Sequence, residues 1–152
     1  QKRAEDIAKK IAHDLQIVRI LAVEMFLTKS GDILVNELAP RPHNSGHQSI
    51  EGNYTSQFNQ HLRAIFNLPL GNTGTRSHAV MINVLGEDGY EGLAKYERVE
   101  EILAMDGVYV HLYGKKFTKP FRKMGHVCII HEDRETAIRT AREVQGILKV
   151  KA

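Results

Sequence analysis

Two apolar runs joined by a short polar turn are the feature that most constrains the fold of this chain. Residues 23–28 and 33–38 each have the composition of a β-strand, and the four residues between them, Lys-Ser-Gly-Asp, are those of a tight turn. If Ser30-Gly31 is the centre of that turn, Glu24 lies directly opposite Glu37. The sequence therefore predicts a hairpin that carries two carboxylates on one face.

The two facing carboxylates need a compensating interaction. Like charges directly opposite each other on neighbouring strands destabilise a sheet, and Phe26 and Val35 on the same face indicate little water to screen them. Either one carboxylate is protonated or a divalent cation lies between them, and Mg²⁺ is the usual choice where carboxylates act together with substrate phosphates. The alternative is a register displaced by one residue, which would leave both Glu24 and Glu37 pointing to solvent.

A stiff polar loop follows the second strand. Pro40 and Pro42 cannot continue a central strand, because proline lacks a ladder donor and holds the preceding residue extended. The polar side chains that this loop presents beside the carboxylates are Arg41, His43, Asn44, Ser45 and His47. Guanidinium and imidazole groups suit an anion such as a phosphate or a carboxylate. We therefore expect an anion-handling site, and a zinc site is disfavoured because no cysteine or third histidine lies near His43 and His47.

The composition narrows the class of protein. The chain has 152 residues, of which 42% are hydrophobic and 26% are charged, as in a soluble globular protein. Its net charge of +3 comes from cations spread along the chain, so nucleic-acid binding is not indicated. No apolar run has the length of a membrane span or a secretory signal, and the single Cys128 cannot form an internal disulfide. These features predict a cytoplasmic protein with no membrane contact.

The remaining periodicity predicts an α+β fold in two parts. Helices are expected over residues 3–15, 56–66, 99–105 and 134–148, and further strands over residues 78–85, 108–113 and 127–130. The second helix is expected to be capped by Asn53 or Thr55 and to turn Phe58, Leu62, Ile65 and Phe66 inward. The stretch 71–75 breaks the pattern and gives regions 1–74 and 75–152. Within the second region, Cys128 is flanked by apolar residues and is expected in the core rather than as a nucleophile.

A second concentration of charge lies between Lys115 and Lys123. Five cations occupy these nine positions, with a proline bend between two strands and no acidic residue to balance them. Such a hairpin concentrates positive potential. The alternative is a strand edge that lysines protect from aggregation.

The hairpin and its loop resemble a known family. Glu24-Met25-Phe26, followed by the run Asn-Glu-Leu-Ala-Pro-Arg-Pro-His-Asn-Ser-Gly-His at residues 36–47, resembles the 5-(carboxyamino)imidazole ribonucleotide synthases, which are ATP-grasp enzymes. The resemblance implies the carboxy-terminal portion of an ATP-grasp domain followed by a small α+β domain. Members of the family are more than twice as long, and their amino-terminal domain and the lysine-bearing half of the ATP clamp would precede Gln1. The chain alone is therefore expected to be inactive.

The resemblance also implies a reaction and a set of site residues. The reaction is ATP-dependent carboxylation of aminoimidazole ribonucleotide with bicarbonate, through carboxyphosphate, in de novo purine biosynthesis. The residues that the resemblance assigns are Glu24 and Glu37 for Mg²⁺, Asn36 and Glu37 for ATP, Arg41 and His43 for catalysis, and Asn44, Lys115 and Arg122 for substrate. In the assumed hairpin, however, Asn36 points away from Glu37. A homodimer with a functional link to the mutase that follows in the pathway is also implied.

Two other classes of function stay open at this point. Another ATP-grasp ligase, such as a biotin carboxylase or the formate-using glycinamide ribonucleotide transformylase, would share the paired acids, although we do not expect the run at residues 36–47 there. The chain could instead be a non-catalytic module for phosphate binding or dimerisation.

Overall fold

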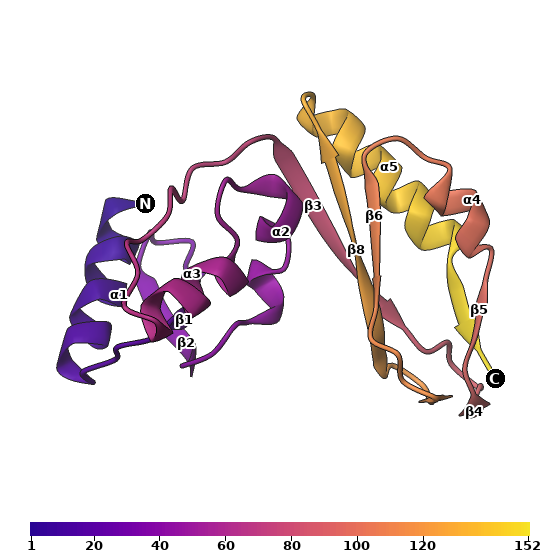
Figure 1. Cartoon of the computed structure of the whole chain (residues 1–152), viewed down its shortest axis with the longest axis horizontal. Coiled ribbons are helices and arrows are strands. Elements are labelled where there is room, and N and C mark those ends of the chain that lie inside the picture. The colour runs from indigo at the N-terminus through magenta and orange to yellow at the C-terminus, as the bar shows by residue number, and fades with distance from the viewer. The chain divides into compact units, whose positions relative to one another are not determined.

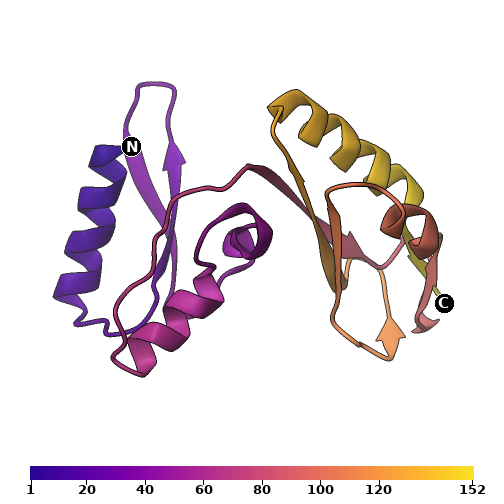
Figure 2. The same ribbon diagram turned by 45° about the horizontal axis from the view of Figure 1, so that its top comes forward.

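The computed structural model describes residues 1–152, which form two compact units (Figures 1 and 2). The first unit comprises residues 1–50 and 55–73, and the second comprises residues 51–54 and 74–152. Up to residue 73 the elements are α1 (Lys2–Asp14), β1 (Ala22–Leu27), β2 (Ile33–Ala39), the 3-10 turn η1 (Asn44–Gly46), α2 (Ser49–Gly52) and α3 (Gln57–Ile65). The later elements are β3 (His78–Leu85), β4 (Gly92–Leu93), β5 (Lys95–Glu97), α4 (Val99–Leu103), β6 (Val108–Leu112), β7 (Phe117–Thr118), β8 (Lys123–His131), α5 (Arg134–Ile147) and β9 (Lys149–Lys151).

The turn between β1 and β2 has one residue more than we predicted. The last paired residues are Leu27 and Ile33, and the N–H of Thr28 donates to the carbonyl of Asp32 at 2.9 Å. Three residues therefore form the loop, and the last of them, Gly31, has a φ of +86°. A left-handed glycine at this position is typical of three-residue hairpin loops. The predicted centre at Ser30-Gly31 is wrong, because it assumed a two-residue loop.

Glu24 nevertheless lies opposite Glu37, as predicted, because β2 contains a bulge. Met25 pairs with Val35 whereas Glu24 pairs with Glu37, so Asn36 is an extra residue in β2. A bulge places two residues of one strand opposite one residue of its partner. The extra residue compensates for the longer turn and restores the predicted pairing of the two carboxylates.

Helices α1 and α3 form where predicted but contain no buried residue, and the short helix α2 was not predicted. Helix α3 begins one residue after Ser56, whose side chain accepts a hydrogen bond from the N–H of Asn59, so the predicted cap by Asn53 or Thr55 is wrong. The apolar residues that we expected to face inward are exposed by 38 to 68%: Phe58, Leu62, Ile65 and Phe66. Only Ala39 and Ser49 are buried within this unit. The first unit therefore has regular secondary structure without a core of its own.

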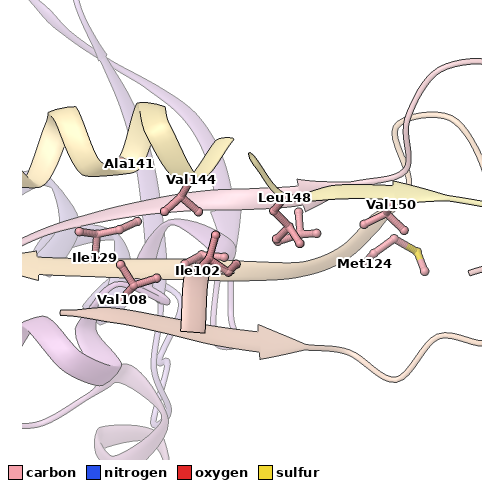
Figure 3. Packing of buried hydrophobic residues seen from close by; sticks show 10 residues of the cluster. Ile102, Val108, Met124, Ile129, Ala141, Val144, Leu148 and Val150 are labelled. Atoms are coloured by element: carbon pink, nitrogen blue, oxygen red, sulfur yellow. The ribbon is translucent and has the colours of Figure 1, made fainter. Parts of the chain in front are cut away.

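The second unit has a continuous apolar core. Strands β3, β8 and β6 form an antiparallel sheet in that order, and α4 and α5 cover one of its faces (Figure 1). The buried cluster comprises Val84, Ile102, Val108, Met124, Val127, Ile129, Ala141, Val144, Leu148 and Val150 (Figure 3). Val127 and Ile129 of β8 are alternate residues, and Val80 and Ile82, which pack against the cluster, alternate with Val84 of β3, as a sheet with one covered apolar face requires. The strands and helices predicted in this region are confirmed, and the short strands β4, β5, β7 and β9 were not predicted.

The opposite face of this sheet carries polar side chains. His111 of β6 pairs with His126 of β8, and their rings stack at 4.4 Å between centroids. The ring of His111 also lies 2.8 Å from a carboxylate oxygen of Glu51, which belongs to the short segment 51–54 of the same unit. Cys128 is fully buried beside them, as expected for a core residue, and burial together with the neighbouring Glu51 raises the pKa of its thiol to about 12.

None of the helices combines the length and the apolar character that a crossing of the bilayer requires.

Candidate functional site

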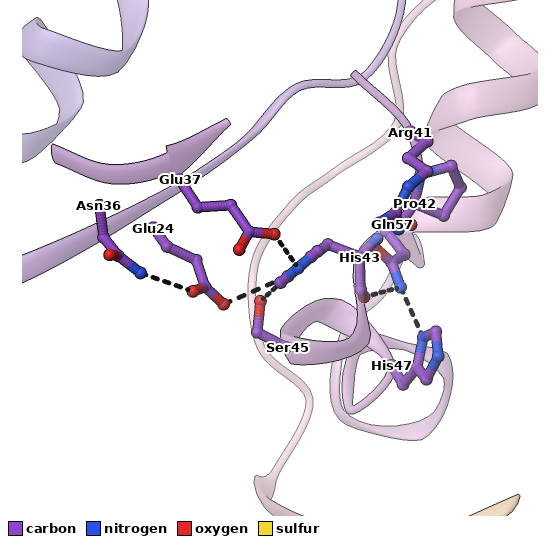
Figure 4. Close-up of polar contacts among 9 residues, drawn as sticks. All are labelled: Glu24, Asn36, Glu37, Arg41, Pro42, His43, Ser45, His47 and Gln57. Carbon is purple, nitrogen blue, oxygen red and sulfur yellow. Dashed lines mark hydrogen bonds and ion pairs between the residues drawn. The ribbon is translucent and has the colours of Figure 1, made fainter. Parts of the chain in front are cut away.

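The bulge in β2 brings an amide to the paired carboxylates. The side-chain N–H of Asn36 donates to Oε2 of Glu24 at 3.4 Å, although a regular strand would turn Asn36 away from that face (Figure 4). The expectation that Asn36 points away is therefore wrong, and the bulge is the reason. Three oxygen-bearing side chains, those of Glu24, Asn36 and Glu37, converge on one face of the hairpin.

This face is open to water. The side chains of Glu24 and Glu37 are 38% and 50% exposed. Phe26 is 58% exposed, and Val35 pairs with Met25, so the register places Val35 on the other face. The expectation that these two apolar residues exclude water from the carboxylates is wrong. Within this chain the mutual repulsion of the carboxylates is screened by solvent.

His43 lies between the two carboxylates. Its Nε2 is 3.2 Å from Oε1 of Glu37, its Nδ1 is 3.4 Å from Oε1 of Glu24, and only 12% of its side chain is exposed (Figure 4). The hydroxyl of Ser45 is 2.9 Å from the same Nδ1. Either neutral tautomer can donate to one carboxylate, and the protonated ring can donate to both. The imidazole thus supplies a compensating interaction that the pairing of the strands alone did not reveal.

Residues outside the predicted set hold the loop that carries His43. The side-chain amide of Gln57 accepts from the N–H of His43 and donates to its carbonyl, both at 2.8 Å. The buried hydroxyl of Ser49 donates to the carbonyl of Gly46 at 2.5 Å and accepts from the N–H of Gln57 at 2.9 Å. No sequence pattern singles out Gln57 or Ser49, because both are common polar residues at the start of a helix. The close approach of Gly46 to Gln57 is a tertiary contact that the sequence does not display.

The other loop residues are turned differently. The guanidinium of Arg41 is exposed, donates to the carbonyl of Pro42 at 3.1 Å and forms no ion pair with either carboxylate. Asn44 is half-buried at the start of η1. His47 stacks on Phe58 at 5.5 Å between ring centroids. No group of three or more His, Cys, Asp and Glu side chains has the arrangement of a metal-binding cluster.

The predicted phosphate contacts lie on one hairpin of the second unit. The ammonium of Lys115 donates to the carbonyl of Lys123 at 2.6 Å, and the guanidinium of Arg122 donates to the carbonyl of Phe117 at 3.0 Å. None of the five cations between Lys115 and Lys123 forms an ion pair. Their positive charge is therefore not neutralised locally. These residues belong to the second unit, whereas the carboxylates and His43 belong to the first.

Two family models match this chain. Residues 1–58 match the ATP-grasp domain, and residues 79–140 match the phosphoribosylaminoimidazole carboxylase C-terminal domain. Together the two matches define part of an ATP-grasp domain followed by the carboxy-terminal domain of the phosphoribosylaminoimidazole carboxylases.

Individual relatives agree with these matches. The N5-carboxyaminoimidazole ribonucleotide synthase of Aquifex aeolicus is 42% identical over 97% of this chain and 39% of that protein. The crystal structure of N5-carboxyaminoimidazole ribonucleotide synthetase from Thermotoga maritima matches with a TM-score of 0.94 and 53% identity, over 99% of this chain and 42% of that one. The Aspergillus clavatus enzyme, solved in complex with ADP and 5-aminoimidazole ribonucleotide, matches with a TM-score of 0.70 and 37% identity, over 83% of this chain and 35% of that one.

The chain belongs to the family of N5-carboxyaminoimidazole ribonucleotide synthases, as the resemblance implied. It spans about two fifths of the length of the relatives that it matches. These relatives are ligases of the ATP-grasp class, and the chain corresponds to a part of one.

Proposed function

We propose that this chain supplies the carboxylate and anion-handling part of a ligase that carboxylates 5-aminoimidazole ribonucleotide with ATP and bicarbonate. The observation that carries the proposal is the convergence of Glu24, Asn36, Glu37 and His43, in a chain that shares 53% of its aligned residues with such an enzyme. The Aspergillus clavatus relative was solved in complex with ADP and 5-aminoimidazole ribonucleotide, which supports an adenine nucleotide and this ribonucleotide as the ligands here.

The proposed reaction has two steps. Bicarbonate attacks the terminal phosphorus of ATP, which gives carboxyphosphate and ADP. The amine of the ribonucleotide then forms a bond to the carboxyl carbon while the bond from that carbon to the phosphate oxygen breaks, and the amine loses a proton. The products are the N-carboxylated ribonucleotide, ADP and phosphate.

The site fits the Mg²⁺ that ATP-dependent phosphoryl transfer requires. Glu24 and Glu37 offer carboxylate oxygens on one exposed face, and the amide of Asn36 lies beside them. Oxygen ligands that leave room for phosphates are those that Mg²⁺ prefers. We propose that Glu24 and Glu37 hold the metal and that Asn36 and Glu37 contact the nucleotide; the ion, when bound, neutralises charge on the phosphates.

The loop residues would act on the reacting anion. Arg41 is exposed and paired only with a backbone carbonyl, so its guanidinium is available for bicarbonate or the transferred phosphoryl group. His43, whose ring nitrogens lie within 3.4 Å of the two carboxylates, would orient the reacting anion or accept a proton beside it. Asn44 begins the turn that follows and would contact the substrate.

Lys115 and Arg122 would bind the phosphate of the ribonucleotide. Both cations are held by backbone carbonyls of their own hairpin and not by carboxylates, so their charge is available to an anion. Charge-assisted hydrogen bonds to phosphate are the strong contacts that a ribonucleotide offers.

A chimera tests the proposed function. Residues 1–152 would replace the matching 42% of the Thermotoga maritima enzyme. We expect ATP hydrolysis only when both aminoimidazole ribonucleotide and bicarbonate are present. Hydrolysis that depends on another acceptor would indicate a different ATP-grasp ligase, and binding of ribonucleotide without any turnover would indicate a non-catalytic module.

The 152-residue chain by itself should bind ATP weakly. No glycine-rich phosphate loop or lysine-bearing clamp lies between Gln1 and the hairpin. Isothermal titration should give a dissociation constant for ATP larger than about 1 μM. That limit corresponds to a binding free energy of about −8 kcal/mol. A micromolar dissociation constant for this chain would contradict the assignment.

The cellular location, the oligomeric state and the division into domains are also part of the proposal. We propose a cytoplasmic homodimer in which residues 1–74 end the ATP-grasp domain and residues 75–152 form the carboxy-terminal domain. Its N-carboxylated product would be the substrate of the mutase that follows in the pathway. Sedimentation equilibrium of the chimera would give the oligomeric state.

A further inference from the structure

The side-chain amide of Gln57 pairs with His43 as a neighbouring strand would. His43 is extended, with φ −116° and ψ 151°, so its N–H and carbonyl are both available for hydrogen bonds. The Oε1 of Gln57 accepts from that N–H and its Nε2 donates to that carbonyl, each at 2.8 Å (Figure 4). One amide therefore satisfies both backbone groups of the residue whose ring lies between the two carboxylates. We call this pair of hydrogen bonds the Gln57 clamp.

The Gln57 clamp is itself held in place. The buried hydroxyl of Ser49 accepts from the N–H of Gln57 at 2.9 Å, and the Nε2 of Gln57 also lies 2.8 Å from Nδ1 of His47. A Cβ on Gly46 would lie 2.5 Å from Oε1 of Gln57, so there is room for the amide only because residue 46 is glycine. The orientation of the amide is fixed by His43, whose N–H needs an acceptor and whose carbonyl needs a donor.

We propose that Gln57 is a positioning residue of this site, which fixes the backbone of His43 and thereby the place where the imidazole meets Glu24 and Glu37. This inference rests on the proposed function for its effect on catalysis. Gln57 touches neither carboxylate in the structure, so it acts through His43. Outer residues that orient the groups of a reactive site typically change activity about ten- to hundredfold when they are replaced.

The same helix supplies a matched control. Gln60 of α3 donates to the carbonyl of Gly71 at 2.8 Å and accepts from its N–H at 2.9 Å. This second clamp has the same chemistry and nearly the same distances as the first, but the residue that it holds carries no reactive side chain. A purely structural role predicts equal effects for the two glutamines, whereas a positioning role predicts unequal ones.

The experiment compares Gln57→Met and Gln60→Met in the chimera with the Thermotoga maritima enzyme. We expect Gln57→Met to lower kcat about ten- to hundredfold while the KM values for ATP and ribonucleotide change by less than about threefold. Gln60→Met should leave kcat within about twofold. Gly46→Ala keeps every polar group but displaces the amide of Gln57, so it should lower kcat as Gln57→Met does. Equal losses in the two glutamine variants, or an unchanged kcat in Gln57→Met, would overturn the proposal.

Nuclear magnetic resonance of the 152-residue chain separates this proposal from the proposed function. Gln57→Met should raise the exchange rate of the His43 amide at least about tenfold and shift the ring resonances of His43, and Gln60→Met should do neither. An inactive unsubstituted chimera would reject the proposed function, yet these resonances would still show whether Gln57 positions His43. Unchanged His43 resonances in both Gln57→Met and Gly46→Ala would reject the positioning role.

Discussion

The two units of this chain are stabilised in different ways. All ten residues of the buried apolar cluster lie in the second unit, whereas the first unit buries only Ala39 and Ser49. The first unit leaves many large apolar side chains exposed: Leu15, Val18, Phe26, Leu27, Leu34, Val35, Leu38, Phe58, Leu62, Ile65, Phe66, Leu68 and Leu70. What orders its functional loop is a set of hydrogen bonds around Gln57.

This difference separates the burial of apolar surface from the ordering of a polar site. The apolar pattern of α3 is sufficient to specify a helix, but burial of that pattern requires a partner surface. A polar site can be held in place without a core around it, provided that its backbone groups are satisfied by well-placed side chains. We therefore expect the second unit to be sensitive to changes in apolar volume and the first to the loss of hydrogen bonds.

The largest effect on stability is expected in the core of the second unit. Ile102 has no exposed surface, so Ile102→Ala removes buried methyl groups and leaves a cavity, at a cost of about 2–5 kcal/mol. Leu62→Ala is the control, because Leu62 is 54% exposed and its loss should cost less than about 0.5 kcal/mol. Urea unfolding followed at amide resonances of each unit measures both. Similar costs for the two variants would contradict the comparison.

The units should also differ in the ligand that they bind. In the chimera, Arg122→Ala should raise the KM for aminoimidazole ribonucleotide by a factor of roughly ten to one hundred and fifty, because a charge-assisted contact of about 1.5–3 kcal/mol is lost. The KM for ATP should stay nearly unchanged. Glu37→Gln should instead impair the use of ATP. Lys119→Ala, which removes another cation of the same hairpin, is the control for net charge. An Arg122→Ala variant that weakens ATP and not the ribonucleotide would reverse the assignment.

A smaller effect is expected from one buried hydroxyl in the first unit. Ser49→Ala removes the acceptor for the N–H of Gln57 and the donor to the carbonyl of Gly46, so two backbone groups lose a partner. The expected cost is about 1–3 kcal/mol. Ser45→Ala, at an exposed position of the same loop, should cost less than about 0.5 kcal/mol. Equal costs in urea unfolding would show that the loop does not depend on the buried hydroxyl.

The smallest effect concerns a helix cap in the second unit and depends on pH. The carboxylate of Asp133 accepts from the N–H of Thr136 at 2.7 Å, and the hydrogen bonds from Thr136 lower the pKa of Asp133. A lowered pKa in the folded state stabilises the protein above the pKa of the unfolded state, and that contribution is lost as the pH falls through the folded value. Asp133→Asn keeps an acceptor for the cap and should reduce the acid dependence of the melting temperature. An identical acid dependence in both proteins would contradict this role.

The sequence was sufficient to predict most of the secondary structure, because strands and helices in the second unit follow simple apolar periods. It also predicted that Glu24 faces Glu37, although for an incomplete reason. The longer turn and the bulge at Asn36 each change the register by one residue, and neither alters the apolar pattern of β2. Periodicity cannot detect this bulge, since β2 is an apolar run of three residues followed by Asn36 and Glu37 and has no regular alternation that one more residue would interrupt.

The structure of the site was less predictable than its composition. The run at residues 36–47 indicated which side chains would gather there, but not that His43 would lie between the carboxylates. That arrangement depends on Gln57, fourteen residues further along the chain. The burial that we predicted for the first unit was also wrong. An amphipathic pattern indicates which face of an element is apolar but not whether anything covers that face.

The segment 51–54 has a consequence for how genes of this family can recombine. It belongs to the second unit, although the residues on both sides of it belong to the first. Its Glu51 lies 2.8 Å from His111, and these two positions are separated by sixty residues of sequence. A single crossover between two homologous genes anywhere from codon 52 to codon 110 would take residue 51 from one parent and residue 111 from the other. Exchange of the carboxy-terminal region as a cassette should therefore succeed more often between parents that share both residues.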